Sequence, residues 1–256
     1  MRSETELFSP AELRIYSLIA AGDGIKAREI SARLGIDKSE ISRMMVSSAL
    51  MRELCYQDRE YRWHAIVRQQ APHEGLYEFS GWYGTVAEFL AENEEQWLRE
   101  LEDGCRRIGR SLNDKRGLIH SFTDCRKTMR ALFADLRDMS NLDFSEWEIV
   151  FELRFNLRRY LRIYADVLVI AGGKVFSLEF KMKNKTDPDE VLQAAKYVPY
   201  LEVLFGQHTD VYPALVLTGA SELFAYEQIG KTDYVLPVCS GNMLFNVFNE
   251  YLGFLN

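Results

Sequence analysis

The stretch that decides the fold is "YADVLVIAGGKVFSLEFKMKNK", residues 164–185. Two apolar runs flank the pair Gly172-Gly173. Two glycines in this setting indicate a tight β-hairpin, because a type I′ turn needs positive φ at both central positions. If Ala171 faces Lys174 across the turn, the same register places Asp166 opposite Glu179. The sequence therefore predicts that two carboxylates meet on one face of a hairpin.

This hairpin carries charges that packing alone does not require. Directly opposed residues have Cβ atoms about 5 Å apart, so Asp166 and Glu179 would repel each other. Lys181 shares their face because side chains alternate along a strand. A bound divalent cation would remove the repulsion, and hard oxygen ligands of this kind suit Mg²⁺ or Mn²⁺. The alternative is a solvated strand face with a compensating ion pair.

The residues of this hairpin resemble the PD-(D/E)XK nuclease superfamily. Asp166 is followed by "SLEFKMK", which contains Glu179 and Lys181, and Ala165 stands where the family name has proline. The resemblance implies that Asp166 and Glu179 bind Mg²⁺ or Mn²⁺ and that Lys181 assists the water that attacks a phosphodiester bond. It covers about residues 146–220.

A second motif of the same superfamily follows the hairpin. "QAAKY" places Gln193 and Tyr197 one turn apart on a predicted helix. It resembles the QxxxY element of the branch that contains RecB and lambda exonuclease, which implies that both residues contact nucleic acid beside the active site. Lys183, in "KMKNK", is expected to add local positive charge for phosphates.

The position of a further acidic residue stays open at this point. Glu152 resembles an extra acidic residue of helicase-fused nuclease modules, which implies that it binds the metal or aligns the site. The alternatives lie on earlier helices, and the sequence does not rank Glu94, Glu95 and Asp135.

The predicted elements around the hairpin form an α/β (α+β) arrangement. "EWEIVFELRFNL" alternates as a half-buried strand. One face is formed by Trp147, Ile149, Phe151, Leu153, Phe155 and Leu157, and the other by Glu148, Glu152 and Arg154. Residues 187–206 predict one helix with Asp187 as N-cap and Pro188 at its first position. "VYPALVLTG" predicts a further strand. The order from about residue 118 is αβββαβ with a mixed sheet, the core of the restriction-endonuclease-like fold that the resemblance implies.

The N-terminal part resembles a winged helix-turn-helix of the bacterial regulator type. Three helical patterns, with "REISARLGIDKSEISRMM" at their centre, precede two short strands around a polar turn. The third helix is expected to begin at Asp37, with Glu40 as its capping-box partner, and to continue to Leu54. In such folds this helix enters the major groove, which implies nucleic-acid contacts by Lys38, Ser39, Ser42 and Arg43. The alternative is a helical domain that serves only packing or dimerisation.

These patterns divide the chain into three parts. Residues 1–70 form the winged helix-turn-helix, residues 71–145 a helical connector with the first helices of the nuclease domain, and residues 146–256 the nuclease core. Within the connector, residues 85–112 predict one amphipathic helix with a break near Gly104. Residues 124–139 predict another, capped by Thr123 or Asp124.

Composition restricts the partners only weakly. The chain has 256 residues and a formal net charge of −7, which argues against binding nucleic acid by bulk charge but not against a local basic groove. No apolar run approaches eighteen residues, and the first residues lack a signal-peptide pattern. The four scattered cysteines predict reduced thiols. We therefore expect a cytoplasmic protein with no membrane partner, and a homodimer is compatible with this sequence.

The leading prediction is a metal-dependent nuclease that hydrolyses DNA, with DNA favoured over RNA by analogy with the family. Phage defence (an antiviral role), restriction or repair are the settings this design suits. Two alternatives remain: a DNA-binding regulator whose nuclease-like domain is catalytically silent, and an RNase gated by a ligand or partner. The sequence does not distinguish endonuclease from exonuclease action.

Overall fold

The computed structural model describes residues 9–22, 24–65, 75–110, 115–158, 161–206, 209–230 and 232–254. The chain forms two compact units. The first comprises Met1–Gly75, Phe155–Ile163 and Val198–Thr209, and the second comprises Leu76–Arg154, Tyr164–Tyr197 and Asp210–Asn256. The domain boundary predicted at residue 70 lies outside the described residues.

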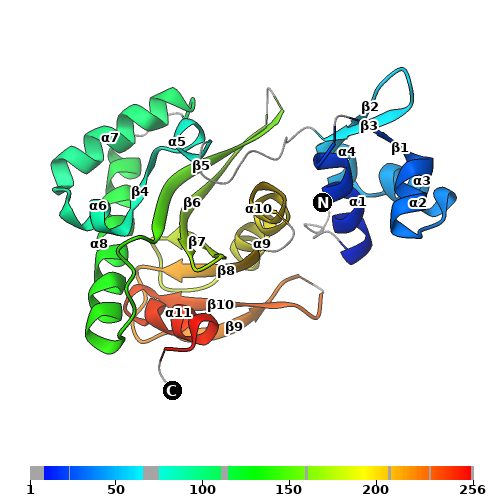
Figure 1. Ribbon diagram of the computed structural model, residues 1–256. Coiled ribbons are helices and arrows are strands. Elements are labelled where there is room, and N and C mark those ends of the chain that lie inside the picture. The colour runs from blue at the N-terminus through cyan, green and yellow to red at the C-terminus, as the bar shows by residue number, and fades with distance from the viewer. Residues whose placement is uncertain are drawn as a thin grey trace. The chain divides into compact units, whose positions relative to one another are not determined.

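The first unit begins with helices and a small sheet (Figure 1). Its helices at the N-terminal end are α1 (Pro10–Ala20), α2 (Ala27–Leu34), α3 (Lys38–Ser47) and α4 (Ala49–Leu54). The described part also holds a three-stranded antiparallel sheet in the order β1 (Ile25–Lys26), β3 (Arg62–Ala65), β2 (Cys55–Gln57). Its core is aliphatic, and fully buried members include Ile15, Ile19, Ile30, Ile41, Met51 and Leu54.

The predicted third helix differs from the structure in two details. It does not run to Leu54, because Ser48 ends α3 and its hydroxyl accepts a hydrogen bond from the Met51 N–H to start α4. Asp37 is the N-cap as predicted, but its carboxylate accepts from the Ser39 N–H, and no capping box with Glu40 forms.

The second unit is built on a mixed sheet. Within the described ranges seven strands follow the order β4-β5-β6-β7-β8-β10-β9. Their bounds are β4 Trp82–Thr85, β5 Glu148–Arg158, β6 Leu161–Ala171, β7 Lys174–Lys181, β8 Asp210–Leu217, β9 Phe224–Gln228 and β10 Val235–Ser240. β7, β8 and β10 pair in parallel, whereas β4–β5, β6–β7 and β9–β10 are antiparallel. The predicted α/β class with a mixed sheet is therefore confirmed.

Helices cover both faces of this sheet (Figure 1). One face carries α6 (Val86–Ala91), α7 (Glu94–Arg107), α8 (Lys115–Met139) and α11 (Leu244–Leu252), which share a core with alternate residues of the strands. α9 (Pro188–Lys196) packs against β7 and β8, and its buried Val191, Ala194 and Ala195 lie outside that shared core. The short elements are α5 (Leu76–Phe79) and the 3₁₀ helix η1 (Gly241–Met243).

Several helix boundaries were predicted wrongly. The break in residues 85–112 lies at Asn93, whose side chain accepts from the Gln96 N–H and starts α7, and not at Gly104. α8 begins at Lys115 and not at residue 123 or 124. β4 was not predicted at all. The helix predicted for residues 187–206 begins at Asp187 and Pro188 as expected but divides into α9 and α10 (Val198–Phe205).

The division between α9 and α10 has a simple cause. Pro199 has no N–H, and its ring would clash with the carbonyl of Ala195 in a continuous helix. α9 therefore ends at Lys196, with Tyr197 as its C-cap. The observed order from α8 is α-β-β-β-α-α-β.

The hairpin of β6 and β7 has the predicted register. Gly172 and Gly173 both have positive φ (57° and 81°), and Ala171 pairs with Lys174. The paired positions continue to Val167 opposite Leu178. Val167 and Leu178 belong to the core under α8 and α11, so the residues that alternate with them face the other side of the sheet.

β5 does not keep the alternation that its sequence predicts. Glu152 has φ +56°, a left-handed conformation that is unusual for a residue with a side chain. The Gly81 N–H donates to both the Phe151 and Glu152 carbonyls (2.9 and 3.2 Å), as at a β-bulge. Glu152 is therefore not an exposed residue of a polar strand face, because it is only 4% exposed.

Two further expectations concern the whole chain. None of the helices in the described ranges combines the length and apolarity needed to cross a membrane. The described structure contains all four cysteines as buried, free thiols, as the sequence predicts.

Candidate active site

Asp166 ties β6 to β7 where their described ladder ends. The last paired positions are Val167 and Leu178, and one residue further the Oδ2 atom of Asp166 accepts a hydrogen bond from the Phe180 N–H at 2.9 Å. The carboxylate thus takes a main-chain donor of the neighbouring strand. This contact holds Asp166 at the level of Glu179, close to the cross-strand arrangement that the register predicts.

Lys181 joins the strand to α9. Its Nζ atom donates to Oε1 of Glu179 at 2.7 Å and to Oε1 of Gln193 at 3.3 Å. The Nε2 atom of Gln193 in turn donates to the Tyr197 hydroxyl at 3.2 Å. The structure therefore brings the two sequence motifs, Glu179-Lys181 and Gln193-Tyr197, into one hydrogen-bonded chain.

Glu152 meets a residue that the sequence analysis missed. Its Oε2 atom lies 2.9 Å from Nε of Arg110, and the Arg110 guanidinium lies over the Tyr164 ring at 4.6 Å from the centroid. Tyr164 precedes Asp166 by two positions and so shares its face of β6. The one local signal in the sequence is Gly109, because a glycine after a helix often adopts a left-handed conformation that reverses the chain.

Burial dominates the electrostatics of these acids. Burial, reinforced by the negative charge of Asp166, raises the pKa of Glu179 to about 8, and Lys181 opposes the shift. Burial and Asp166 likewise raise the pKa of Glu152 to about 8, against Arg110. Burial also raises the pKa of Asp166, although the Phe180 N–H, Lys181 and Arg110 favour its ionised form. Burial thus favours the protonated forms of these acids unless further positive charge is supplied.

The Lys181 amine stays protonated in this setting. Burial alone would lower its pKa, but the charge and hydrogen bond of Glu179, followed by Asp166, outweigh burial and raise the pKa above its ordinary value. As arranged here, Lys181 is a cation that stabilises negative charge, and it is not a free base.

The oxygen atoms available to a hard cation belong to Glu179, Asp166 and Glu152. Among the described residues no three His, Cys, Asp or Glu side chains converge tightly enough to enclose a metal ion. However, the Oε2 atom of Glu179, a residue only 1% exposed, is buried without a hydrogen-bond partner in the described structure. Mg²⁺ needs only one or two carboxylates and completes its shell with water or phosphate. These oxygen atoms are therefore of the type that such an ion takes, and Asp166 and Glu179 are the residues that would hold it.

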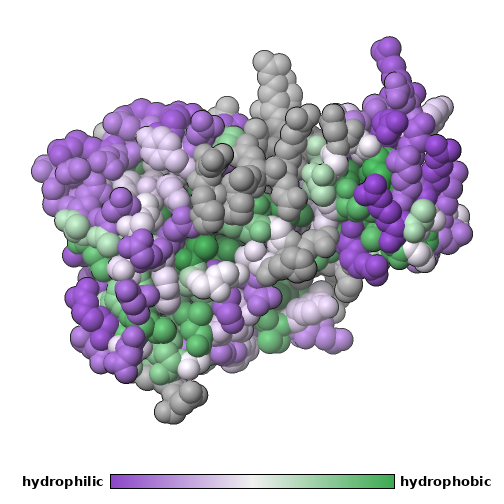
Figure 2. Space-filling view, viewed as in Figure 1, coloured by the Kyte–Doolittle hydropathy of each residue, from purple (hydrophilic) through white to green (hydrophobic). Residues whose placement is uncertain are grey.

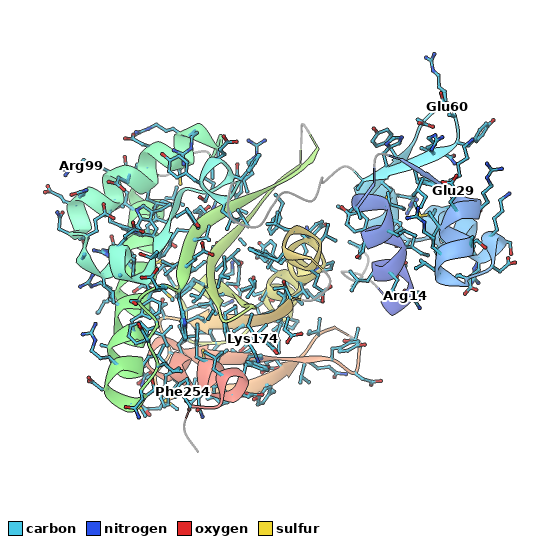
Figure 3. The ribbon with its side chains drawn as sticks, in the orientation of Figure 1. Arg14, Glu29, Glu60, Arg99, Lys174 and Phe254 are labelled. Carbon is cyan, nitrogen blue, oxygen red and sulfur yellow. The ribbon has the colours of Figure 1, made fainter. Side chains whose placement is uncertain are left out.

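The other predicted residues make contacts of their own. Lys183 forms an ion pair with Glu190 (2.8 Å). Glu94 and Glu95 occupy the exposed first turn of α7, where Glu95 lies 4.0 Å from Arg99, which Figure 3 labels on the surface. Burial and Asp138 raise the pKa of Asp135 on α8, and neither involves the cluster. Of the four candidate acids, Glu152 is the one whose raised pKa includes an effect of the Asp166 charge in the described structure.

In the first unit, the residues of α3 that are predicted to contact nucleic acid are all exposed. Lys38, Ser39, Ser42 and Arg43 lie on a surface that is mostly hydrophilic over α2 and α3 (Figure 2). The Ser39 hydroxyl is bonded to Asp37, and Arg43 lies 3.9 Å from Glu40. Glu60 projects from the turn between β2 and β3 (Figure 3).

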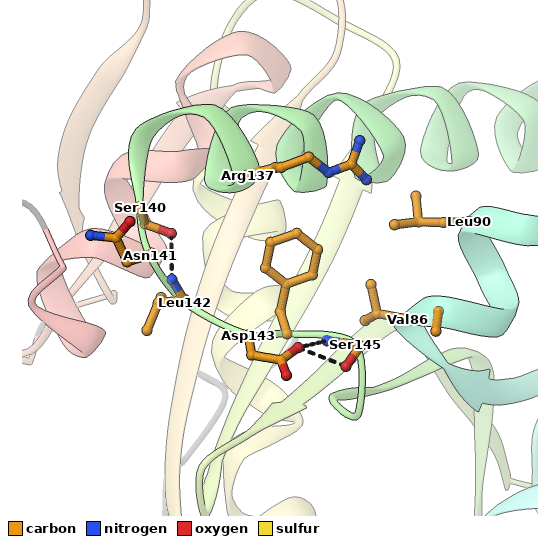
Figure 4. Close-up of a pocket in the computed structure, with 10 residues that line it drawn as sticks. Val86, Leu90, Arg137, Ser140, Asn141, Leu142, Asp143 and Ser145 are labelled. Carbon is orange, nitrogen blue, oxygen red and sulfur yellow. Dashed lines mark hydrogen bonds between the residues drawn. The ribbon is translucent and has the colours of Figure 1, made fainter.

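A surface hollow of about 490 Å³ lies elsewhere in the second unit (Figure 4). It is lined by α6, by the end of α8 including Arg137, and by residues 140–145. None of the residues of the acid cluster lines it. The hollow is therefore separate from the acid cluster of Asp166, Glu179 and Glu152.

No family model and no curated protein matches the chain. Among solved structures, the chain is similar to protein VC1899 from Vibrio cholerae at 11% sequence identity and a TM-score of 0.28. The match covers 97% of this chain, which spans 57% of the length of that protein. A TM-score this low does not establish a shared fold.

Proposed function

We propose that the chain is a metal-dependent nuclease of the PD-(D/E)XK type that hydrolyses phosphodiester bonds of DNA. The observation that carries the proposal is the hydrogen-bonded chain from Glu179 through Lys181 and Gln193 to Tyr197, beside Asp166. Two motifs far too short to be decisive alone meet here in one buried polar cluster. The order α8-β5-β6-β7-α9-α10-β8 is compatible with the restriction-endonuclease-like αβββαβ core that this proposal requires, with its second helix divided in two.

Each residue has a role that follows from its surroundings. Asp166 and Glu179 would hold Mg²⁺ or Mn²⁺, with Glu152 as a third oxygen donor or an aligning group. The ion, when bound, supplies a polarised water and charge stabilisation at the phosphate. Lys181, held as a cation, stabilises developing negative charge, and Gln193 fixes the direction of its amine.

The N-terminal unit would bring nucleic acid to this site as a winged helix-turn-helix. Support comes from the succession α1, α2, α3 and the antiparallel β2–β3 hairpin, with exposed Lys38 and Arg43 on α3. Phosphate contacts by such residues supply affinity that does not depend on sequence.

The decisive experiment is a cleavage panel with linear, circular and single-stranded DNA and with RNA, each with Mg²⁺ or Mn²⁺. We expect cleavage of DNA that stops on chelation, and loss of activity in Asp166→Ala and in Lys181→Ala. Activity that persists in both variants would remove the site assignment. Degradation of linear but not circular DNA would identify exonuclease action.

One observation favours a second function, a DNA-binding regulator with a silent nuclease-like domain. The 2.7 Å ion pair between Lys181 and Oε1 of Glu179 occupies one of the carboxylate oxygens that a cation would need. In a silent domain this ion pair would serve only to stabilise the buried acid. Tight duplex binding with neither cleavage nor a calorimetric signal for Mn²⁺ would select this function.

A further inference from the structure

The end of α7 has a geometry that none of the proposed nuclease motifs requires. Gly109 has φ +72°, its N–H donates to the Arg106 carbonyl, and the Arg110 N–H donates to the Cys105 carbonyl at 2.8 Å. This pair of bonds defines a Schellman motif, in which a left-handed glycine reverses the chain after a helix. The motif sets the direction in which the Arg110 side chain leaves the helix.

The same helix end is anchored to the strand that carries Glu152. The Arg154 guanidinium donates to the Ile108 carbonyl at 2.7 Å, two positions beyond Glu152 on β5. On the other side, a Cβ atom on Gly104 would lie 1.8 Å from the Gly81 carbonyl oxygen, so α7 touches the Gly81 backbone directly. Gly81 is the residue whose N–H closes the bulge at Glu152.

Arg110 is thus positioned by the Schellman motif and Glu152 by the bulge, and the two side chains meet at 2.9 Å. Glu152 adopts a strained left-handed conformation with a nearly buried side chain, and such strain persists only where the surroundings impose it. The Arg110 guanidinium is in turn held against the Tyr164 ring, two residues before Asp166. An arginine suits this position because its planar guanidinium can stack on the Tyr164 ring and pair with the Glu152 carboxylate at the same time.

We propose that Arg110 is a positioning residue of the candidate site, which fixes the Glu152 carboxylate on the strand next to the one that carries Asp166 and so aligns the residues that would hold a divalent cation. This inference rests on the proposed nuclease function. Arg110 acts through Glu152 and touches neither the reacting atoms nor the cation. Groups that orient the ligands of a metal typically change its affinity about 10- to 100-fold when they are replaced.

The test measures Mn²⁺ binding by calorimetry, and kcat and KM for DNA cleavage, in the full chain. We expect Arg110→Gln to bind Mn²⁺ about 10-fold or more weakly and to lower kcat with little change in KM. Arg110→Lys keeps the charge and should restore part of both. The matched control is Arg106→Gln, because Arg106 is an exposed residue of the same helix end and pairs with Glu102 and Asp103 of its own helix.

A double variant separates positioning from general electrostatics. In a Glu152→Gln background, Arg110→Gln should cause little further loss of Mn²⁺ affinity, because the carboxylate it positions is gone. A second loss of similar size in that background would overturn the proposal. If Arg110→Gln does not fold, Arg110→Lys decides, and unchanged affinity and kcat in that variant would also overturn it.

The two proposals fail in different ways. A wild-type protein that cleaves DNA and binds Mn²⁺ no better than Arg110→Gln would leave the nuclease function standing and remove the role of Arg110. A wild-type protein that neither binds Mn²⁺ nor cleaves any substrate would remove both.

Discussion

The Nζ atom of Lys181 lies 2.7 Å from Oε1 of Glu179, although the two residues are only two positions apart on one strand. Side chains two apart on a strand share a face but do not normally converge. Here the Gln193 amide oxygen, 3.3 Å from the same amine, is its second acceptor. One carboxylate oxygen is thereby paired, and the other, Oε2, is left buried without a described partner.

Lys181→Gln tests the catalytic role of this amine. We expect the rate of DNA cleavage to fall about 100-fold or more, the usual scale for losing a group that acts on the transition state. The variant should still fold, because Lys181 is partly exposed at the end of β7. Lys127→Gln, an exposed lysine on α8, is the control and should keep full activity. Equal rates for both variants would contradict the assignment.

The pKa of Glu179, raised to about 8 chiefly by burial, predicts how stability depends on pH. Between the ordinary value of 4.5 and about 8 the folded chain holds a proton that the unfolded chain has lost. The free energy of unfolding of the metal-free protein should therefore fall as pH rises through this window, by at most about 1.4 kcal/mol per pH unit for each such group. Glu152 adds a slope of the same sign.

Urea unfolding in a chelator at pH 5.5 and pH 8 measures this slope. Glu179→Gln cannot ionise, so its stability relative to wild type should increase from the lower to the higher pH. Glu78→Gln, at an exposed position, should show no such trend. A difference between wild type and Glu179→Gln that stays constant, or changes in the opposite direction, would show that Glu179 is not held protonated by burial.

Metal binding should offset the loss of stability that the ionised acids cause at high pH. A divalent cation competes with protons for the carboxylates, so its affinity rises with pH until the acids are ionised. We expect Mn²⁺ to raise the melting temperature of wild type more at pH 8 than at pH 6, and chelation to reverse the effect. Asp166→Asn keeps an oxygen that can accept from the Phe180 N–H. It should fold but show no Mn²⁺ shift, and a shift equal to that of wild type would exclude Asp166 as a ligand.

Much of the site was predictable because its signals are local. The Gly172-Gly173 turn sets the register of the hairpin, and through it the common face of Asp166, Glu179 and Lys181. Arg110 was not predictable in this way. Its partner Glu152 comes from a distant strand, and the contact depends on a left-handed residue that the sequence does not mark. Alternation alone assigned Glu152 to an exposed face, since period counting assumes an unbroken strand.

The helices show the same division between local and tertiary information. Caps at Asp37 and Asp187 are local, and both are present. Gly104 was expected to break a helix because glycine is a poor helix former. In the structure it lies inside α7, because the close contact with Gly81 leaves no room for a side chain.

Gly104→Ala should therefore destabilise the second unit despite the better helix propensity of alanine. A Cβ atom there would lie 1.8 Å from the Gly81 carbonyl oxygen, and overpacking of this kind costs about 1–3 kcal/mol. Gly22→Ala is the control, because its Cβ would meet nothing closer than 3.9 Å. Thermal unfolding that is the same for Gly104→Ala as for wild type would show that α7 can move away from β4 at little cost.

Arg43 and Arg14 offer a matched test of nucleic-acid binding by the first unit. Both side chains are exposed. Arg43 lies on α3, and Arg14, which is labelled in Figure 3, lies on α1. Each phosphate contact on duplex DNA contributes about 0.9 to the slope of log affinity against log salt concentration. In an Asp166→Asn background, which we expect to block the proposed cleavage, Arg43→Gln should weaken duplex binding and reduce this slope by about one. Arg14→Gln should leave the slope unchanged. Equal losses in both variants would mean that α3 has no special part in binding, and the N-terminal unit would then serve packing or dimerisation instead.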